Sequence, residues 1–515
     1  MPDDLEKALG TVAKGGGILF FGTIVGILLA MINSIMLARI LGVEDFGLFY
    51  LAFSIVSVFI PFSTLGLGGS LPRYLPFHFG RGEKDIVKSA IRFSHMLVLC
   101  TSIFFGVILY FFSEKLSTDI FHDSNLTLAV KYFAIGIPLL SSSHILEAVV
   151  RSFKATKYKV AIYDIGIWTI RIIVFIPFIM IGYSFFGAII SYLIAIFFTI
   201  IVSLFIVRKK LFPDQSKYQT VPIGKKLLSF SWPLAVAGIL SLFLTKIVTL
   251  LIGFYLTTSD VGIYMPASVI ASYVTLFATP VGYIFLPVVS ELFGRAKKET
   301  IESLFKSASK WIFMMIMPVF IYILLFPKEV IALLYGGEYS EGYLCLIILA
   351  TGISMNVFTG MTGGILVGGG YLKLNLTVEI IASITNVALL VILIPIYGII
   401  GAAIGTSASF FIRNIAQTVF VYKTTKMHAF NKKYVGIIFS GLIVFIVFYL
   451  YKALVFPFLS SAFFVILTGI LLLGLYTILI LIFRCLDKND VFILKIIMKR
   501  LRLNGKMFRS FIDFR

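Results

Sequence analysis

The stretch "LARILGVEDFGLFYLA" at residues 37–52 returns in altered form as "IGFYLTTSDVGIYMPA" at residues 252–267. Four positions are identical in the two stretches: Leu41/Leu256, Asp45/Asp260, Gly47/Gly262 and Ala52/Ala267. In each copy a short polar turn joins two apolar runs, which is typical of a tight turn between two helices. We predict that Asp and Gly supply the cap and the turn at the start of the second helix. The same helix–turn–helix is therefore written twice.

The likeness continues on both sides of this stretch at a nearly constant offset. Three further pairs of segments match, namely "LPRYLPFHFGRGEKDIVKSAIRF" (71–93) with "LPVVSELFGRAKKETIESLFKSASKW" (286–311), "ATKYK" (155–159) with "GGYLK" (369–373), and "FFGAII" (185–190) with "IIGAAI" (399–404). A constant offset over separated segments indicates an internal repeat. We predict two copies of a six-helix unit, residues 1–212 and 213–427.

Because six is an even number, both copies enter the membrane with the same orientation, as parallel repeats do. We expect two lobes that face each other across a cavity. Two more helices, within residues 428–485, follow the repeats. The tail, residues 486–515, alternates apolar and basic residues at helical spacing, so it is expected to lie as an amphipathic helix on the inner leaflet.

Composition places the chain in a membrane. Of its 515 residues 59% are hydrophobic and only 13% are charged, and the mean hydropathy is +1.04. A run of about 20 apolar residues lets a helix cross a bilayer, and we count about fourteen such runs. The sequence therefore predicts an all-α polytopic membrane protein with about 14 transmembrane helices.

The net charge of +20 is distributed unevenly. Most of the 44 Lys and Arg fall on one side of the predicted spans, in clusters such as "RKK" (208–210), "RAKK" (295–298) and "NKK" (431–433). Loops with such an excess stay on the cytoplasmic side. We expect a multi-pass protein of the cell membrane with both termini in the cytoplasm, whose basic residues meet anionic membrane lipid rather than nucleic acid.

Nothing in the sequence indicates a cofactor. Cys100, Cys345 and Cys485 are scattered, so we expect neither a disulfide framework nor a metal site. The glycine-rich segment "GMTGGILVGGGYLK" (360–373) lacks the Gly-Lys-Ser/Thr of a phosphate loop, so no nucleotide partner is expected. No loop is long enough to house a separate catalytic domain, and the chain is not expected to be an enzyme.

Charged residues inside or near the ends of the apolar spans are the candidate functional residues. A charge at the centre of a membrane helix costs about 2.5–3.5 kcal/mol on insertion scales, so it normally faces protein, ligand or water. The candidates are Arg39, Arg73, Glu147, Asp164, Arg171, Lys246, Glu379 and Arg413.

Lys246 lies deep within "SLFLTKIVTLLIGFYL" (241–256), with no acid within a helical turn. It contacts an anionic ligand in the central cavity, pairs with an acid from another helix, or extends its side chain towards the lipid headgroups. Arg73 follows the loosened helix end "LGLGGSLP" (65–72). Its planar fork suits a phosphate group, and the alternative is a basic anchor at the membrane surface. We predict both residues to be substrate-binding cations.

Arg39 lies on the outer side, where this chain has few basic residues. It either pairs with Glu44 or Asp45 or guides a phosphate at the exit. We count it as a third candidate substrate-binding cation.

The remaining charges suggest two polar networks in the membrane. Glu147, Asp164 and Arg171 are expected to form one between helices, and Glu379 with Arg413 is expected to mirror it in the second repeat. Such carboxylates either have a structural role or bind the protons or sodium ions that drive transport.

The segment "ARILGVEDFGLFYLA" (38–52), followed by "STLGLGGSLPRYLP" (63–76), resembles the start of a known transporter family. This is the polysaccharide-transporter branch, the oligosaccharide flippases, of the multidrug/oligosaccharidyl-lipid/polysaccharide exporter superfamily. The resemblance implies fourteen helices in a V-shaped pair of lobes. It also implies movement of lipid-linked saccharides from the inner to the outer leaflet.

These observations predict a flippase that moves a (poly)prenyl-phosphate-linked oligosaccharide by alternating access, for polysaccharide or glycan biosynthesis. Its partners would be the lipid-linked oligosaccharide, anionic lipid and glycan-assembly enzymes. Three alternatives remain open: an ion-coupled multidrug exporter, a flippase of the peptidoglycan precursor, and a non-transport membrane scaffold or synthase.

Overall fold

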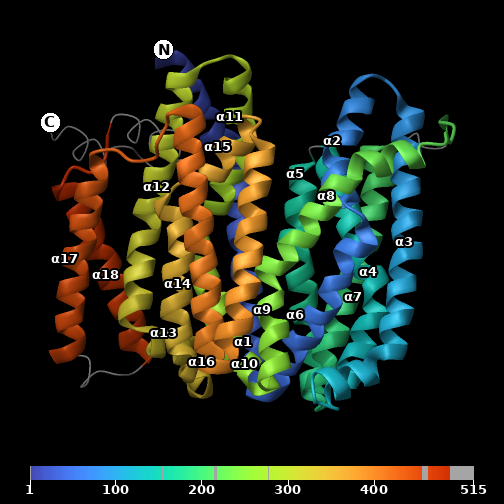
Figure 1. The fold of residues 1–515 in the computed structure, drawn as a ribbon, viewed down its shortest axis with the longest axis horizontal. Helices are drawn as coiled ribbons and strands as arrows, with labels where there is room; N and C mark the ends of the chain where they lie inside the picture. The colour runs from blue at the N-terminus through green and yellow to red at the C-terminus, as the bar shows by residue number, and fades with distance from the viewer. Residues whose placement is uncertain (1, 154, 214–216, 277, 455–461, 488–515) are drawn as a thin grey trace. The chain divides into compact units, whose positions relative to one another are not determined.

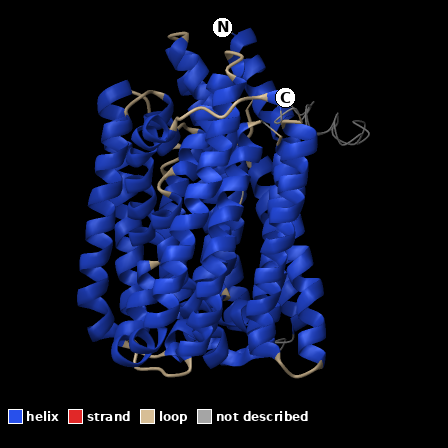
Figure 2. Cartoon of the chain, turned by 90° about the vertical axis from the view of Figure 1, so that its right-hand side faces the viewer, coloured by secondary structure: helices blue, strands red, loops and turns tan. Residues whose placement is uncertain are grey.

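The computed structural model describes residues 2–153, 155–213, 217–276, 278–454 and 462–487. Within these residues every regular element is a helix and none is a strand (Figure 2). In chain order (Figure 1) the α-helices are α1 (Pro2–Thr64), α2 (Leu67–Gly80), α3 (Lys84–Lys115), α4 (Leu126–Ser152), α5 (Thr156–Lys159), α6 (Ile167–Met180), α7 (Ser184–Ile206), α8 (Gly224–Thr245), α9 (Ile247–Tyr255), α10 (Thr258–Ser272), α11 (Ala278–Gly294), α12 (Lys298–Leu325), α13 (Pro327–Leu334), α14 (Tyr343–Phe358), α15 (Thr362–Gly368), α16 (Leu372–Thr425), α17 (Lys433–Leu454) and α18 (Ala462–Ile482).

Among the described residues, ten helical stretches are long and apolar enough to cross a membrane. The chain is therefore a multi-pass helical membrane protein, as composition predicted. The count of fourteen and the arrangement of the repeats remain predictions.

Two of the ten stretches are much longer than one crossing requires. Phe21–Gly80 has 60 residues and Leu372–Thr425 has 54, whereas about 20 suffice. Each contains a glycine with positive φ, 75° at Gly42 and 58° at Gly398. A positive φ interrupts a right-handed helix, and glycine adopts it without a steric penalty. Leu372–Thr425 is therefore two helical arms joined at Gly398, whereas Phe21–Gly80 is broken at Gly42 and again at Gly66, whose φ of 76° separates α1 from α2.

Helix α8 is separated from α9 by a single residue, Lys246. Its φ and ψ are −111° and −27°, outside the usual helical range, so the axis is interrupted although no glycine or proline stands there. The amide of Lys246 still donates to the carbonyl of Leu242 at 2.8 Å, and its own carbonyl accepts from Leu250 at 3.3 Å. Backbone hydrogen bonding therefore continues across the break.

The chain packs as two compact units, which are described separately. The first unit comprises Phe21–Pro266 and Ser383–Gly405. The second unit comprises Met1–Phe20, Ala267–Ala382 and Thr406–Arg515, as far as these ranges are described. The units do not follow the predicted repeat boundary at residue 212, which stays a prediction about the sequence repeat.

Within the first unit the two copies of the repeated turn touch each other. A Cβ added at Gly47 would lie 1.9 Å from the carbonyl oxygen of Thr258. A Cβ added at Gly262, the equivalent glycine, would lie 2.0 Å from the carbonyl oxygen of Val43. The same glycine is written twice because each copy must approach the backbone of the other.

The cap predicted for the second copy is confirmed. The carboxylate of Asp260 accepts hydrogen bonds from the backbone amide of Thr257 at 3.1 Å and from its hydroxyl at 2.6 Å. The amide of Asp260 donates back to the Thr257 hydroxyl oxygen at 3.2 Å. This reciprocal arrangement is a capping box, and it starts α10.

Candidate functional site

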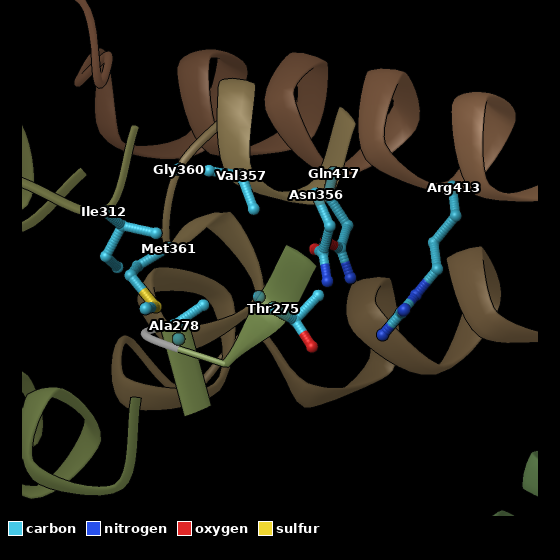
Figure 3. Close-up of a pocket in the computed structure, with 11 residues that line it drawn as sticks. Thr275, Ala278, Ile312, Asn356, Val357, Gly360, Met361, Arg413 and Gln417 are labelled. Carbon is cyan, nitrogen blue, oxygen red and sulfur yellow. The ribbon is translucent and has the colours of Figure 1, made fainter. Parts of the chain in front are cut away.

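A pocket of about 260 Å³ lies within the second unit (Figure 3). Its walls come from the 3-10 turn Tyr273–Thr275, from the start of α11 and from α12, α14, α15 and α16. The lining residues are Thr275, Ala278, Ile312, Asn356, Val357, Gly360, Met361, Gly363, Gly364, Arg413 and Gln417.

The polar side of the pocket is built from three long side chains. Arg413 and Gln417 are one turn apart on the second arm of α16, so they lie on the same face of the helix. Asn356, from α14, contributes a second amide group to the lining (Figure 3). The pocket therefore has amide and guanidinium groups in its wall.

The helical backbone is interrupted beside these side chains, between α14 and α15. Gly360 has φ +80°, which separates the two helices. The amide of Met361 donates to the hydroxyl of Ser309 on α12 at 3.3 Å. A Cβ added at Gly360 would lie 2.2 Å from that hydroxyl, so glycine is required both for the turn and for the close approach.

A chain of hydrogen bonds holds the amides in place. The hydroxyl of Thr362 donates to Gln417 Oε1 at 3.2 Å, and Gln417 Nε2 donates to Asn375 Oδ1 at 3.2 Å. The hydroxyl of Thr359 donates to Asn414 Oδ1 at 3.5 Å. Gln417 is therefore oriented from two sides before any ligand arrives.

Arg413 is neutralised by Glu379, so the structure brings the two predicted residues together. Arg413 Nε and Nη2 lie 2.9 Å and 2.8 Å from the same carboxylate oxygen, Glu379 Oε1. The two side chains come from opposite arms of α16, on either side of Gly398. A pocket with amides and a neutralised guanidinium offers hydrogen bonds without net charge, which suits a ligand rich in hydroxyl groups.

Lys246 lies in the first unit, against an aromatic ring. Its Nζ is 5.1 Å from the centre of the Phe53 ring, a cation–π contact. Among the described residues no carboxylate lies within ion-pair distance of it, so the alternative of a paired structural lysine is not realised here.

Arg73 and Arg39 are both exposed. The guanidinium of Arg73, on α2, lies 5.8 Å from the centre of the Phe230 ring of α8. Neither is brought to Lys246 by a contact within the described residues, so the three predicted cations do not form one cluster in this structure.

The network predicted among Glu147, Asp164 and Arg171 does not form. Asp164 Oδ1 lies 2.5 Å from Lys159 Nζ, and Glu147 Oε1 lies 3.8 Å from Arg151 Nε. The reason for the first pair is local. Val160–Gly166 is a π-helical segment, in which residues five apart share a face. The Arg171 side chain is instead buried among aromatic rings.

Sequence reasoning missed Asn356 and Thr275 as pocket residues. Neither carries a formal charge, and a single amide or hydroxyl in an apolar span does not stand out. The grouping "RNIAQ" (413–417) on one helix was the one signal that pointed to this face. Among the described residues no group of three or more His, Cys, Asp or Glu is placed to hold a metal ion.

Comparison with known proteins places these features in a family. A profile of the family described as polysaccharide biosynthesis protein matches residues 36–343. An uncharacterized membrane protein of Methanocaldococcus jannaschii is 26% identical over 415 residues, covering 77% of this chain and 81% of that protein.

A protein of Haloferax volcanii, named as a probable low-salt glycan biosynthesis flippase, is 28% identical over 192 residues. That match covers 37% of this chain and 41% of the relative. Among solved structures, the lipid II flippase MurJ in an inward closed conformation superimposes with a TM-score of 0.72. The superposition covers 91% of this chain and 99% of MurJ at 19% identity, and it bears on the fold alone.

Proposed function

We propose that this chain, which belongs to the family of polysaccharide biosynthesis proteins and is a flippase-like membrane transporter, moves a polyprenyl-phosphate-linked oligosaccharide from the inner to the outer leaflet. The observation that carries the proposal is Lys246, a lysine within an apolar helix pair without a carboxylate partner among the described residues. A charge kept in such a place calls for an anionic ligand.

The anionic ligand we propose is the phosphate or diphosphate that joins lipid to saccharide. Lys246 would attract it as a point charge, and Arg73 would bind two oxygens through its planar fork. Arg39 would act near the outer end. The polyprenyl chain would stay in the lipid, since each buried CH₂ contributes about 0.8 kcal/mol.

Separately from the phosphate site, we propose that the pocket within the second unit binds a sugar. Asn356, Gln417 and Thr275 offer both donors and acceptors, and Glu379 removes the net charge of Arg413. Sugar hydroxyls need such mixed partners. The pocket is small relative to an oligosaccharide, so we propose that it takes one sugar unit.

Transport is proposed to proceed by alternating access of the two sequence repeats, residues 1–212 and 213–427, with about 14 transmembrane helices and both termini in the cytoplasm. Helices within 428–485 and the basic tail 486–515 would lie outside the repeats, the tail on anionic lipid of the inner leaflet. The driving force would be the membrane potential, an ion gradient or consumption of the saccharide outside. Asp164 and Glu147 are the carboxylates of the first repeat proposed for ion coupling.

Mass spectrometry of cellular lipids tests this function. Cells that lack the protein, and cells that carry Lys246→Ala, should accumulate a polyprenyl-phosphate-linked saccharide, whose mass identifies the sugar. Lys225→Ala is the matched control, because Lys225 lies on the same helix pair but is exposed. Accumulation of the peptidoglycan precursor instead would assign that substrate, and no accumulation in the deletion strain would contradict the flippase function.

A further inference from the structure

Arg171 is the most deeply buried of the predicted intramembrane charges of the first unit. It lies on α6, and only 5% of its surface is exposed. Its guanidinium carbon is 4.6 Å from the centre of the Tyr192 ring, 5.2 Å from that of Phe49 and 5.9 Å from that of Trp168. Three aromatic rings from three helices thus surround one cation.

The rings leave one edge of the guanidinium without a hydrogen-bond partner. Within the described residues, Nε and Nη2 of Arg171 are buried and donate to nothing. These two nitrogens form the side of the group that binds two oxygens of a carboxylate or phosphate at once. A ring face attracts the positive charge, but it does not replace the oxygen acceptors that such donors require.

The nearest acids in sequence do not fill this edge. Asp164 is seven residues away on the same helical run, and its carboxylate is held by Lys159 at 2.5 Å and by the hydroxyl of Thr23 at 3.4 Å. Glu147 faces Arg151. Both carboxylates are therefore already occupied by partners of their own.

The same aromatic cluster carries a second ring-bound cation of this unit. Tyr192, which lies against Arg171, meets the ring of Phe53 edge-on with centroids 5.5 Å apart. Phe53 in turn lies under Lys246, 5.1 Å from its Nζ. Arg171 and Lys246 are thus two positive charges joined by two rings within one compact unit.

We propose that the Nε–Nη2 edge of Arg171 is a binding site for a phosphate group. It is closed in this structure, and the ligand enters when the helices around it separate. The site rests on the proposed function for its physiological ligand, a phosphate of the lipid-linked saccharide that passes between Lys246 and Arg171. Free inorganic phosphate shares the same chemistry.

Trp168 provides a built-in reporter of this site. The chain has three tryptophans, so Trp232→Phe with Trp311→Phe leaves Trp168 as the single fluorophore. The purified full-length protein in detergent would be titrated with inorganic phosphate, with a polyprenyl phosphate, and with chloride at matched ionic strength. Arg171→Lys keeps the charge and removes the two-nitrogen edge. Arg151→Lys is the matched control, because that arginine faces Glu147.

We expect a saturable change of Trp168 fluorescence that is weakened at least tenfold in Arg171→Lys and unchanged in Arg151→Lys. A response to both phosphate probes supports a site for the phosphate group itself. A response to polyprenyl phosphate alone supports a site reached from the lipid.

No saturable response to either phosphate probe, an equal response in Arg171→Lys, or chloride binding as strong as phosphate binding would each overturn the proposal. The measurement does not depend on transport. Failure of the proposed function would instead appear as a deletion strain without accumulated lipid-linked saccharide.

Discussion

Replacing Gly47 by alanine tests the contact between the two copies of the repeated turn. The new Cβ would lie 1.9 Å from the carbonyl oxygen of Thr258, whereas real Cβ contacts below 3.0 Å are essentially unknown. The two backbones must therefore separate by about 1 Å. Overpacking of this kind costs about 1–3 kcal/mol, and alanine's better helix propensity returns at most about 1 kcal/mol.

Thermal unfolding of the purified protein in detergent, followed by tryptophan fluorescence, measures this change. One kcal/mol corresponds to about 2–4 °C in domains of 150–250 residues. Gly47→Ala and Gly262→Ala should each lower the melting temperature. The double variant should lower it by less than the sum, because both substitutions separate the same two backbones.

Gly68→Ala is the matched control. Gly68 lies inside α2, and a Cβ added there meets no atom within 4 Å. Its melting temperature should stay the same or rise slightly. If Gly47→Ala were as stable as Gly68→Ala, or if the double variant were fully additive, the close contact between the two turns would be refuted.

Three further measurements address other parts of the molecule. Glu379→Gln should lower the melting temperature, because it weakens the half-buried ion pair with Arg413. A double-mutant cycle with Arg413→Gln should give a coupling free energy of about 1–2 kcal/mol. A coupling free energy of zero would show that the pair does not stabilise the protein. Asp487 Oδ2 lies 2.5 Å from Nζ of the fully buried Lys310. Asp487→Asn should therefore destabilise the protein, because it leaves that buried charge without this ion-pair partner. An unchanged melting curve would contradict that role. Burial raises the pKa of the Cys485 thiol and so lowers its thiolate fraction at neutral pH. In a Cys100→Ser Cys345→Ser variant, a maleimide should label Cys485 slowly, faster as pH rises, and fully only after denaturation in SDS; fast labelling of Cys485 in the folded variant at neutral pH would contradict its burial.

The helical membrane fold was predictable because its signals are local. Apolar runs and the repeated polar turn involve residues that are neighbours in sequence, and the Asp260 cap follows from one helical turn. The sequence did not predict which segments of the chain form each compact unit, because this depends on long-range contacts such as that of Gly262 with Val43. The sequence also does not indicate the helix break at Lys246, because no glycine or proline stands at that position.

The ion pairs among intramembrane charges were predictable only where few other residues of opposite charge lay within reach. Glu379 and Arg413 met as expected, because they lie on two arms joined at one glycine. For Asp164 the expected partners were Glu147 and Arg171, in a network between helices. A π-helical turn placed Lys159 on its face instead, and a pattern search that assumes 3.6 residues per turn does not see this.

The intramembrane charged residues, which look equivalent in the sequence, therefore have two different kinds of surroundings in the structure. Arg413 and Asp164 each form an ion pair with another residue of the chain. An external ion would have to compete with that partner, so its binding is weaker. Lys246 and Arg171 lie against aromatic rings, which lower the cost of burying a cation without cancelling its charge. A ring-bound cation stays attractive to an anion in a setting of low dielectric constant, where that attraction is strongest. The aromatic cluster around Phe53 is thus better understood as a support for unneutralised charge than as filler of the core.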